Sequence, residues 1–121
     1  MNLYSSSETY ILSLFARPLD FDTDYLTICQ WWEDQKWPAI TKEYLPKTGY
    51  IVDGYCAGFI YLTDSKFGLL EFVISNPKTD KELRSEAILL LLDALIKKSK
   101  EMGIGMLFTS LEHPKLIERY Q

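Results

Sequence analysis

Glu71 and the segment that follows it hold the residues best suited to chemistry. Glu71 lies in the middle of an apolar, strand-like run, residues 69–75, where a charged side chain needs a reason. One interpretation is that the carboxylate of Glu71 has a chemical role. The alternative is that it lies on the solvent-facing side of a sheet that is covered on one face only. A helix is predicted to begin near residue 80, and its free N–H groups and positive dipole end suit an anion such as a pyrophosphate. Lys81 and Arg84 add positive charge there.

Composition excludes several classes of site. The chain has 121 residues and a formal net charge of −4, whereas non-specific nucleic-acid binding needs a dominant positive field. A lone histidine, His113, excludes a multi-histidine metal site within one chain, so no metal is expected. Cys29 and Cys56 form no CxxC motif and are expected to pack in the core of a protein from a reducing compartment. Without a signal sequence or a membrane-length apolar run, a cytoplasmic protein is expected.

The pattern of apolar residues and breakers predicts one domain, residues 1–121, with the element order β-α-α-β-β-β-α-β-α. Arg17 and Pro18 are expected to end the first strand, and the Asp53–Gly54 dipeptide predicts a tight turn. The predicted strands are residues 10–16, 50–52, 56–63, 69–75 and 104–110. The predicted helices run from Asp20 or Asp22 to about Gln35 and over residues 39–45, 81–102 and 113–121.

The connections between these elements predict the fold class. Short loops between the three middle strands make an antiparallel meander. The helix of residues 81–102, which ends before Gly103, then links two strands in a βαβ unit. Residues 69–75 and 104–110 are therefore expected to be parallel neighbours. The fold class is α/β (α+β), with a mixed sheet that ends in a parallel pair.

This order, together with three sequence segments, resembles the GNAT superfamily of acetyl-CoA-dependent N-acetyltransferases over about residues 10–121. The segments are residues 55–61, similar to the family's third strand, residues 70–77, similar to its fourth strand with the following proline, and residues 116–120, similar to the start of its last helix. Trp31, Trp32 and Trp37 before a Leu-Pro pair are similar to those of short phage-encoded members.

The resemblance implies a site in which an amine attacks the thioester of acetyl-CoA directly, in a ternary complex. Glu71 is implied as the general base on the amine, and Tyr120 as the acid that protonates the leaving thiolate. A strand N–H near Val73 would stabilise the oxyanion. The alternative for Tyr120 is an aromatic side chain that packs on the sheet. The implied cofactor-binding residues are Phe72, Val73, Ile74, Ser75, Lys81, Arg84, Ser85, Glu86 and Ala87.

Departures from the family pattern keep a second hypothesis open. The family's phosphate loop reads Gln/Arg-x-x-Gly-x-Gly/Ala, and residues 82–87 keep only its last small residue, Ala87. Ser85 replaces the glycine, and Glu82 puts a negative charge at the mouth of a phosphate site. The family also continues past the position of Tyr120 into further strands. The alternative function is a non-catalytic binding or assembly protein that keeps the scaffold.

The comparison with the family also predicts an exposed sheet edge. The strand of residues 104–110 would lack the neighbour that it has in the family. An uncovered apolar edge strand tends to pair with strands of other chains. A second copy in a symmetric homodimer, or another protein, is expected to cover it, unless residues 1–8 do so. Trp31, Trp32 and Trp37 with Tyr44 are candidates for an acceptor groove or a protein contact, with core packing as the alternative.

Overall fold

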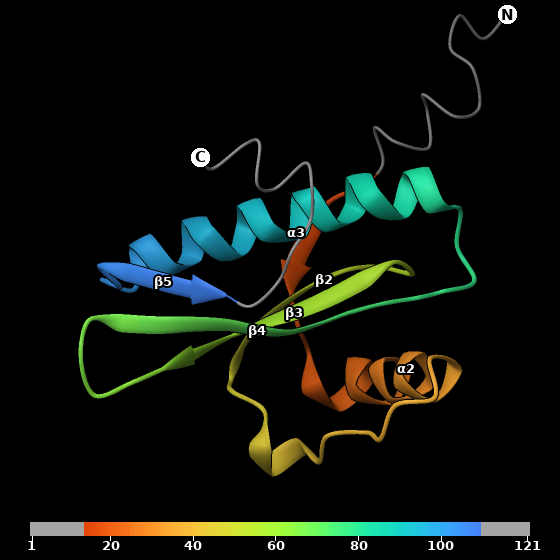
Figure 1. Ribbon diagram of the computed structural model, residues 1–121, viewed down its shortest axis with the longest axis horizontal. Helices are drawn as coiled ribbons and strands as arrows, with labels where there is room; N and C mark the ends of the chain where they lie inside the picture. The colour runs from red at the N-terminus through yellow and green to blue at the C-terminus, as the bar shows by residue number, and fades with distance from the viewer. Residues whose placement is uncertain (1–13, 110–121) are drawn as a thin grey trace, which may run out of the picture.

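The structure, a computed structural model, describes residues 14–109, which form a five-stranded mixed sheet with one helix on each face (Figure 1). The strands lie across the sheet in chain order: β1 (Ala16–Pro18), β2 (Thr48–Val52), β3 (Cys56–Leu62), β4 (Phe67–Ser75) and β5 (Met106–Thr109). The helices are α2 (Phe21–Asp34), the 3-10 helix η1 (Lys42–Tyr44) and α3 (Lys81–Glu101). The expected α+β class with a mixed sheet is confirmed.

The pairing of the strands follows the loop lengths. Strands β1 to β4 pair antiparallel in sequence, and the Val52–Tyr55 turn between β2 and β3 has Gly54 at a φ of 81°, which suits glycine. Strand β5 pairs parallel with β4, from Phe67 with Met106 to Leu70 with Thr109. The parallel neighbours predicted from the βαβ unit are therefore confirmed.

Helix α2 begins where the sequence predicts. Asp20 is its N-cap, and the Asp20 carboxylate accepts a hydrogen bond from the N–H of Asp22 at 3.0 Å. The inner face of the helix buries Ile28, Trp31 and Trp32. They pack on one face of the sheet against Ile51, Ala57, Phe59 and Ile74. Core packing is thus the outcome for two of the three tryptophans.

Helix α3 covers the other face of the sheet. Asp80 caps its start, and Gly103, at a φ of 80°, follows its end, as the sequence predicts. Its apolar side packs on the sheet through a shared core: Val52, Cys56, Ile60, Leu70, Ala87, Leu91, Leu92 and Leu95. Within residues 14–109, no helix has the length and apolar character that crossing a membrane requires.

Some predicted boundaries are wrong. Strand β1 contains Arg17 and Pro18, which were expected to end it. Proline has no N–H to donate to a neighbouring strand, and it is tolerated here because β1 lies at the edge of the sheet and has a neighbour on one side only. The predicted helix of residues 39–45 is only the 3-10 turn η1, because the backbone is extended at Thr41 and Leu45 on either side. The predicted helix of residues 113–121 and the start of the predicted first strand lie outside the described residues.

An ion-pair network joins β1, α2 and the turn after β2. The Arg17 guanidinium donates to the Asp24 carboxylate at 2.9 and 2.8 Å, and to the Asp53 carboxylate at 2.7 and 3.1 Å. Asp24 is buried and also accepts from the N–H of Asp20 at 2.7 Å. The hydrogen bonds from Arg17 hold the pKa of Asp24 below its usual value. The network therefore stabilises the ionised form of a buried carboxylate.

We expect Asp24→Asn to lower the free energy of unfolding by about 2 kcal/mol, because it removes the charged partner of Arg17 at a buried position. Asp53→Asn is the matched control: its side chain is 60% exposed, and it should cost less than about 1 kcal/mol. Urea unfolding at neutral pH measures both values. Equal losses for the two variants would contradict the role given to Asp24.

The same pair predicts a pH dependence. The folded-state pKa of Asp24 is lower than its unfolded value, so the stabilisation is complete above that unfolded value, about 3.9. It is lost as the pH falls through the folded-state pKa. The difference in unfolding free energy between the wild type and Asp24→Asn should therefore shrink from about pH 5 to pH 2. A difference that stays constant over this range would overturn the assignment.

Candidate functional site

Glu71 lies beside a β-bulge in strand β4. The pairs of β3 and β4 around it are Ala57 with Ile74, Phe59 with Glu71 and Ile60 with Leu70. Phe72 and Val73 therefore lie opposite the single residue Gly58, which is the arrangement of a bulge. Phe72 has a φ of 57°, in the left-handed region that a bulky residue rarely adopts. Strained backbone of this kind clusters at functional sites, so the bulge is the first element of the candidate site.

Glu71 shares one face of the sheet with two aromatic side chains. Glu71 pairs with Phe59, which packs in the core under α2, so its side chain is on the α2 side. The Tyr61 and Phe72 rings meet edge to face with centroids 5.7 Å apart, and the Tyr61 hydroxyl donates to the carbonyl of Tyr44 at 2.8 Å. Burial, and then the charge of Glu71, raise the pKa of Tyr61. A carboxylate, a phenol and a half-exposed ring thus lie together.

The bulge lies just beyond the parallel pairing of β4 with β5. The pairing ends at Leu70, so within the described residues the next part of β4 has no strand neighbour on that side. The implied cofactor residues of β4 differ in what they contact. Val73 packs on the α3 side, Ile74 is buried on the α2 side, and the Ser75 carbonyl accepts from Gln35 Nε2 at 2.8 Å.

The segment that resembles a phosphate loop is helical. Residues 82–87 all lie within α3. The Asp80 carboxylate accepts from the N–H of Leu83 at 3.0 Å, and the Asp80 carbonyl accepts from the N–H of Arg84 at 2.8 Å. The bond to Arg84 is the first regular bond of the helix, and the bond to Leu83 caps one of the N–H groups that a helix start leaves free. The cap also places a carboxylate where a bound phosphate would lie.

Arg84, which the family resemblance implies as a pyrophosphate ligand, bonds the loop between β4 and α3. Its Nη1 donates to the carbonyl oxygens of Asn76 and Thr79 at 3.2 and 3.3 Å. Asn76 in turn donates from Nδ2 to the Gly54 carbonyl at 3.1 Å, and its Oδ1 accepts from the N–H of Lys78 at 3.0 Å. The Asn-Pro pair at residues 76–77, which the sequence predicts as the end of this strand, therefore also anchors the loop.

The other charges around this helix end do not favour an anion. Lys78 makes an ion pair with Asp34 at 3.5 Å. Ala87, the small residue that the segment shares with the family's phosphate loop, is buried in the core. The positive side chains Lys78, Lys81 and Arg84 are matched by the negative Asp80, Glu82 and Glu86. The charges at the N-terminus of α3 therefore give no net attraction for the pyrophosphate of coenzyme A.

The remaining candidates add no second reactive group within residues 14–109. Tyr120, the implied acid, and His113 lie outside the described residues. Burial raises the pKa of the Cys56 thiol to about 12, which makes it a poor nucleophile. Within residues 14–109, no group of three or more histidine, cysteine or acidic side chains is placed to hold a metal ion.

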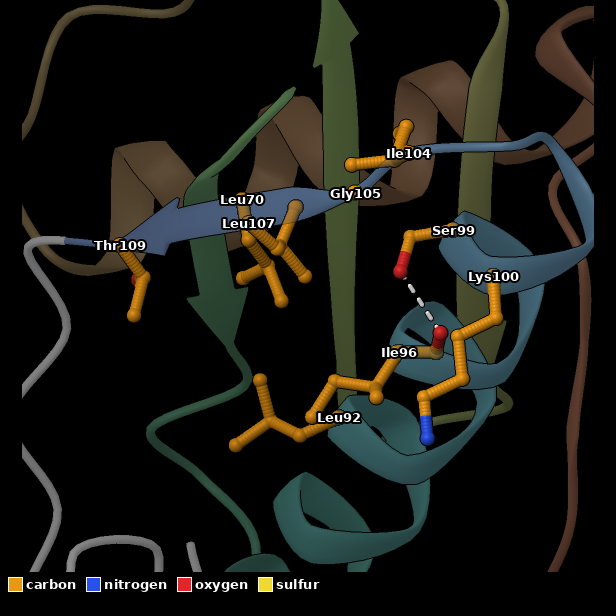
Figure 2. Close-up of a pocket in the computed structure, with 9 residues that line it drawn as sticks. All are labelled: Leu70, Leu92, Ile96, Ser99, Lys100, Ile104, Gly105, Leu107 and Thr109. Atoms are coloured by element: carbon orange, nitrogen blue, oxygen red, sulfur yellow. Dashed lines mark hydrogen bonds between the residues drawn. The ribbon is translucent and has the colours of Figure 1, made fainter. Parts of the chain in front are cut away.

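A cavity of about 310 Å³ lies on the opposite face of the sheet, between α3 and β5 (Figure 2). Its walls are mainly the aliphatic side chains Leu70, Leu92, Ile96, Ile104 and Leu107. The Ser99 hydroxyl at its wall donates to the Ile96 carbonyl at 2.7 Å. The cavity is separated by the sheet from Glu71 and Tyr61, so it is not part of the site at the bulge.

Comparisons with known proteins do not add a family to this description. No family model matches the chain, and no curated protein matches it with a significant score.

Glu71→Gln is expected to lower the pKa of Tyr61, because it removes a negative charge that opposes formation of the phenolate. The pKa should stay above its ordinary value, since burial is the larger cause of the shift and is unchanged. An NMR titration of labelled tyrosine measures this, with Tyr61→Phe to identify the signal. Glu86→Gln, on the helix across the sheet, is the control. An unchanged pKa in Glu71→Gln would contradict the placement of the carboxylate beside the phenol.

Proposed function

We propose that the chain is a non-catalytic binding or assembly domain that keeps an acetyltransferase-like sheet without using coenzyme A. One observation carries this proposal: residues of the chain itself already engage one N–H group and one arginine at the N-terminus of α3. The Asp80 carboxylate bonds the Leu83 N–H, and Arg84 is bonded to the loop before the helix. A pyrophosphate at the Leu83 N–H would have to displace the Asp80 carboxylate and approach Glu82. We place the domain in the cytoplasm, because Cys29 and Cys56 are both free.

The second candidate is an acetyl-CoA-dependent N-acetyltransferase, and the bulge of β4 favours it. Phe72 is strained, and Glu71 beside it has the position of a general base for an amine. The role of Glu71 would be to hold an ammonium group on the α2 side of the sheet and to accept its proton. The capped helix end counts against this candidate, so we derive no step through the cofactor.

Titration with coenzyme A separates the two candidates. We expect no heat of binding by calorimetry at about 1 mM ligand, a limit that corresponds to roughly 4 kcal/mol of binding free energy. We expect Glu82→Gln also to show none, because the Asp80 cap and the Arg84 bonds remain. Glu101→Gln, at the far end of α3, is the matched control because it also removes one negative charge.

Micromolar affinity in the wild type, tighter still in Glu82→Gln, would overturn the proposal in favour of the acetyltransferase. A thiol-release assay with acetyl-CoA and a panel of primary amines gives an independent readout. We expect release at the spontaneous rate, whereas release that depends on the amine and is lost in Glu71→Gln would establish the second candidate.

A further inference from the structure

The cavity between α3 and β5 has a size and a lining that suit a small apolar ligand. Its volume of about 310 Å³ lies at the lower end of the range for ligand pockets, about 300–1,000 Å³. Because an apolar cavity of about 150 Å³ holds one benzene molecule, this cavity has room for about twelve carbon atoms. Figure 2 shows Leu92 and Ile96 of α3 across from Leu70 and Leu107 of the sheet.

One wall of the cavity is Ile104, in the loop between α3 and β5. A Cβ atom at Gly68 would lie 2.9 Å from Cδ1 and 3.2 Å from Cγ2 of Ile104, so the glycine allows this side chain to lie directly on the sheet. The N–H of Ile104 donates to the Ser99 carbonyl at 3.0 Å, and the N–H of Gly105 donates to the Lys66 carbonyl at 2.8 Å. Packing and hydrogen bonds of the chain itself therefore hold this wall in place.

The polar side chains of the lining differ in whether they have a partner. The Ser99 hydroxyl donates to the Ile96 carbonyl at 2.7 Å, and Thr109 also has a partner. In contrast, none of the ion pairs within residues 14–109 involves Lys100. Lys100 is exposed, follows Ile96 by one helical turn and extends beside it in Figure 2. Its ammonium group therefore lies at the rim of an aliphatic cavity.

We propose that the cavity binds a straight-chain carboxylic acid of about eight to twelve carbon atoms, with its carboxylate at Lys100. The alkyl chain would lie between α3 and the sheet, where it needs no hydrogen bonds. A ligand with several polar groups would leave most of them unsatisfied against these aliphatic walls. One carboxylate matches the one ammonium group at the rim. The acidic neighbour Glu101 does not compete for it, since its ion pair is with Lys98, at 4.0 Å.

This site goes beyond the proposed function and is separate from the features on which that proposal depends. The residues of α3 that line the cavity lie between Leu92 and Lys100, whereas the Asp80 cap and Arg84 are at the other end of the helix. Binding of coenzyme A and binding of a carboxylic acid are measured independently, so the failure of either proposal leaves the other standing.

Calorimetry on the full chain at neutral pH tests the inference with hexanoate, octanoate, decanoate and dodecanoate. Affinity should rise about fourfold for each CH₂ group that enters the cavity and should stop rising once the cavity is full. Lys100→Gln should weaken decanoate binding about three- to fivefold and leave binding of the neutral decan-1-ol unchanged. Lys97→Gln is the matched control: it makes the same change on the same helix, at a residue that does not line the cavity.

Two further variants test the position of the alkyl chain. Ile96→Phe and, separately, Leu107→Phe place a larger side chain in the cavity and should weaken decanoate binding at least about tenfold. Decanoate should raise the midpoint of thermal unfolding of the wild type but not of these variants. Circular dichroism confirms that each variant is folded.

Three results would overturn the inference. The first is the absence of decanoate binding at about 1 mM, and the second is binding that persists in folded Ile96→Phe and Leu107→Phe, because the acid would then lie elsewhere. The third is an equal effect of Lys100→Gln on decanoate and decan-1-ol, which would refute the role of the carboxylate. Methyl NOEs from Leu92 or Leu107 to residues 110–121 that persist with decanoate would mean that the chain itself fills the cavity, which also refutes the ligand.

Discussion

The close approach of α3 to strand β3 at Gly58 sets the arrangement of the other elements. A Cβ atom at this position would lie 3.0 Å from Cδ1 of Leu95 and 3.2 Å from Cγ2 of Val73. A side chain at residue 58 would require these methyl groups to shift by a few tenths of an ångström, so the glycine allows the helix to pack closely on the sheet. The crossing point of α3 then determines where its capped N-terminus lies and where β5 joins β4.

The bulge of β4 lies opposite Gly58 and is related to the same packing of α3 on the sheet. Side chains alternate between faces along a strand, and one extra residue reverses the alternation. Leu70 is on the α3 side before the bulge; beyond it, Val73 is on the α3 side and Ile74 is buried on the α2 side. Without the extra residue, Val73 and Ile74 would exchange faces. The strain at Phe72 is therefore offset by packing in both cores, and the bulge needs no catalytic explanation to persist.

Periodicity and turn chemistry were sufficient to predict the mixed sheet, the Asp20 cap and the end of α3 before Gly103. They were insufficient where the conformation of a segment depends on a neighbouring strand that is distant in the sequence. Pro18 can be a strand residue because β1 lies at the edge of the sheet. The bulge depends on how β4 aligns with β3. Part of the candidate site could be predicted, because Glu71 is a charged residue within an apolar run of the sequence. The hydrogen bonds of Arg84 could not, because they depend on how the loop before α3 folds against the helix.

The N-terminus of α3 shows why a family pattern has to be weighed against local hydrogen bonds. The same N–H groups serve either a bound anion or a side-chain cap, and they cannot serve both at once. A cap such as that of Asp80 contributes about 1 kcal/mol to folding, and a ligand must exceed this and the repulsion from Glu82 before it binds. One carboxylate at the start of the helix therefore competes with a phosphate for the same N–H group, while the sheet that the helix covers stays the same.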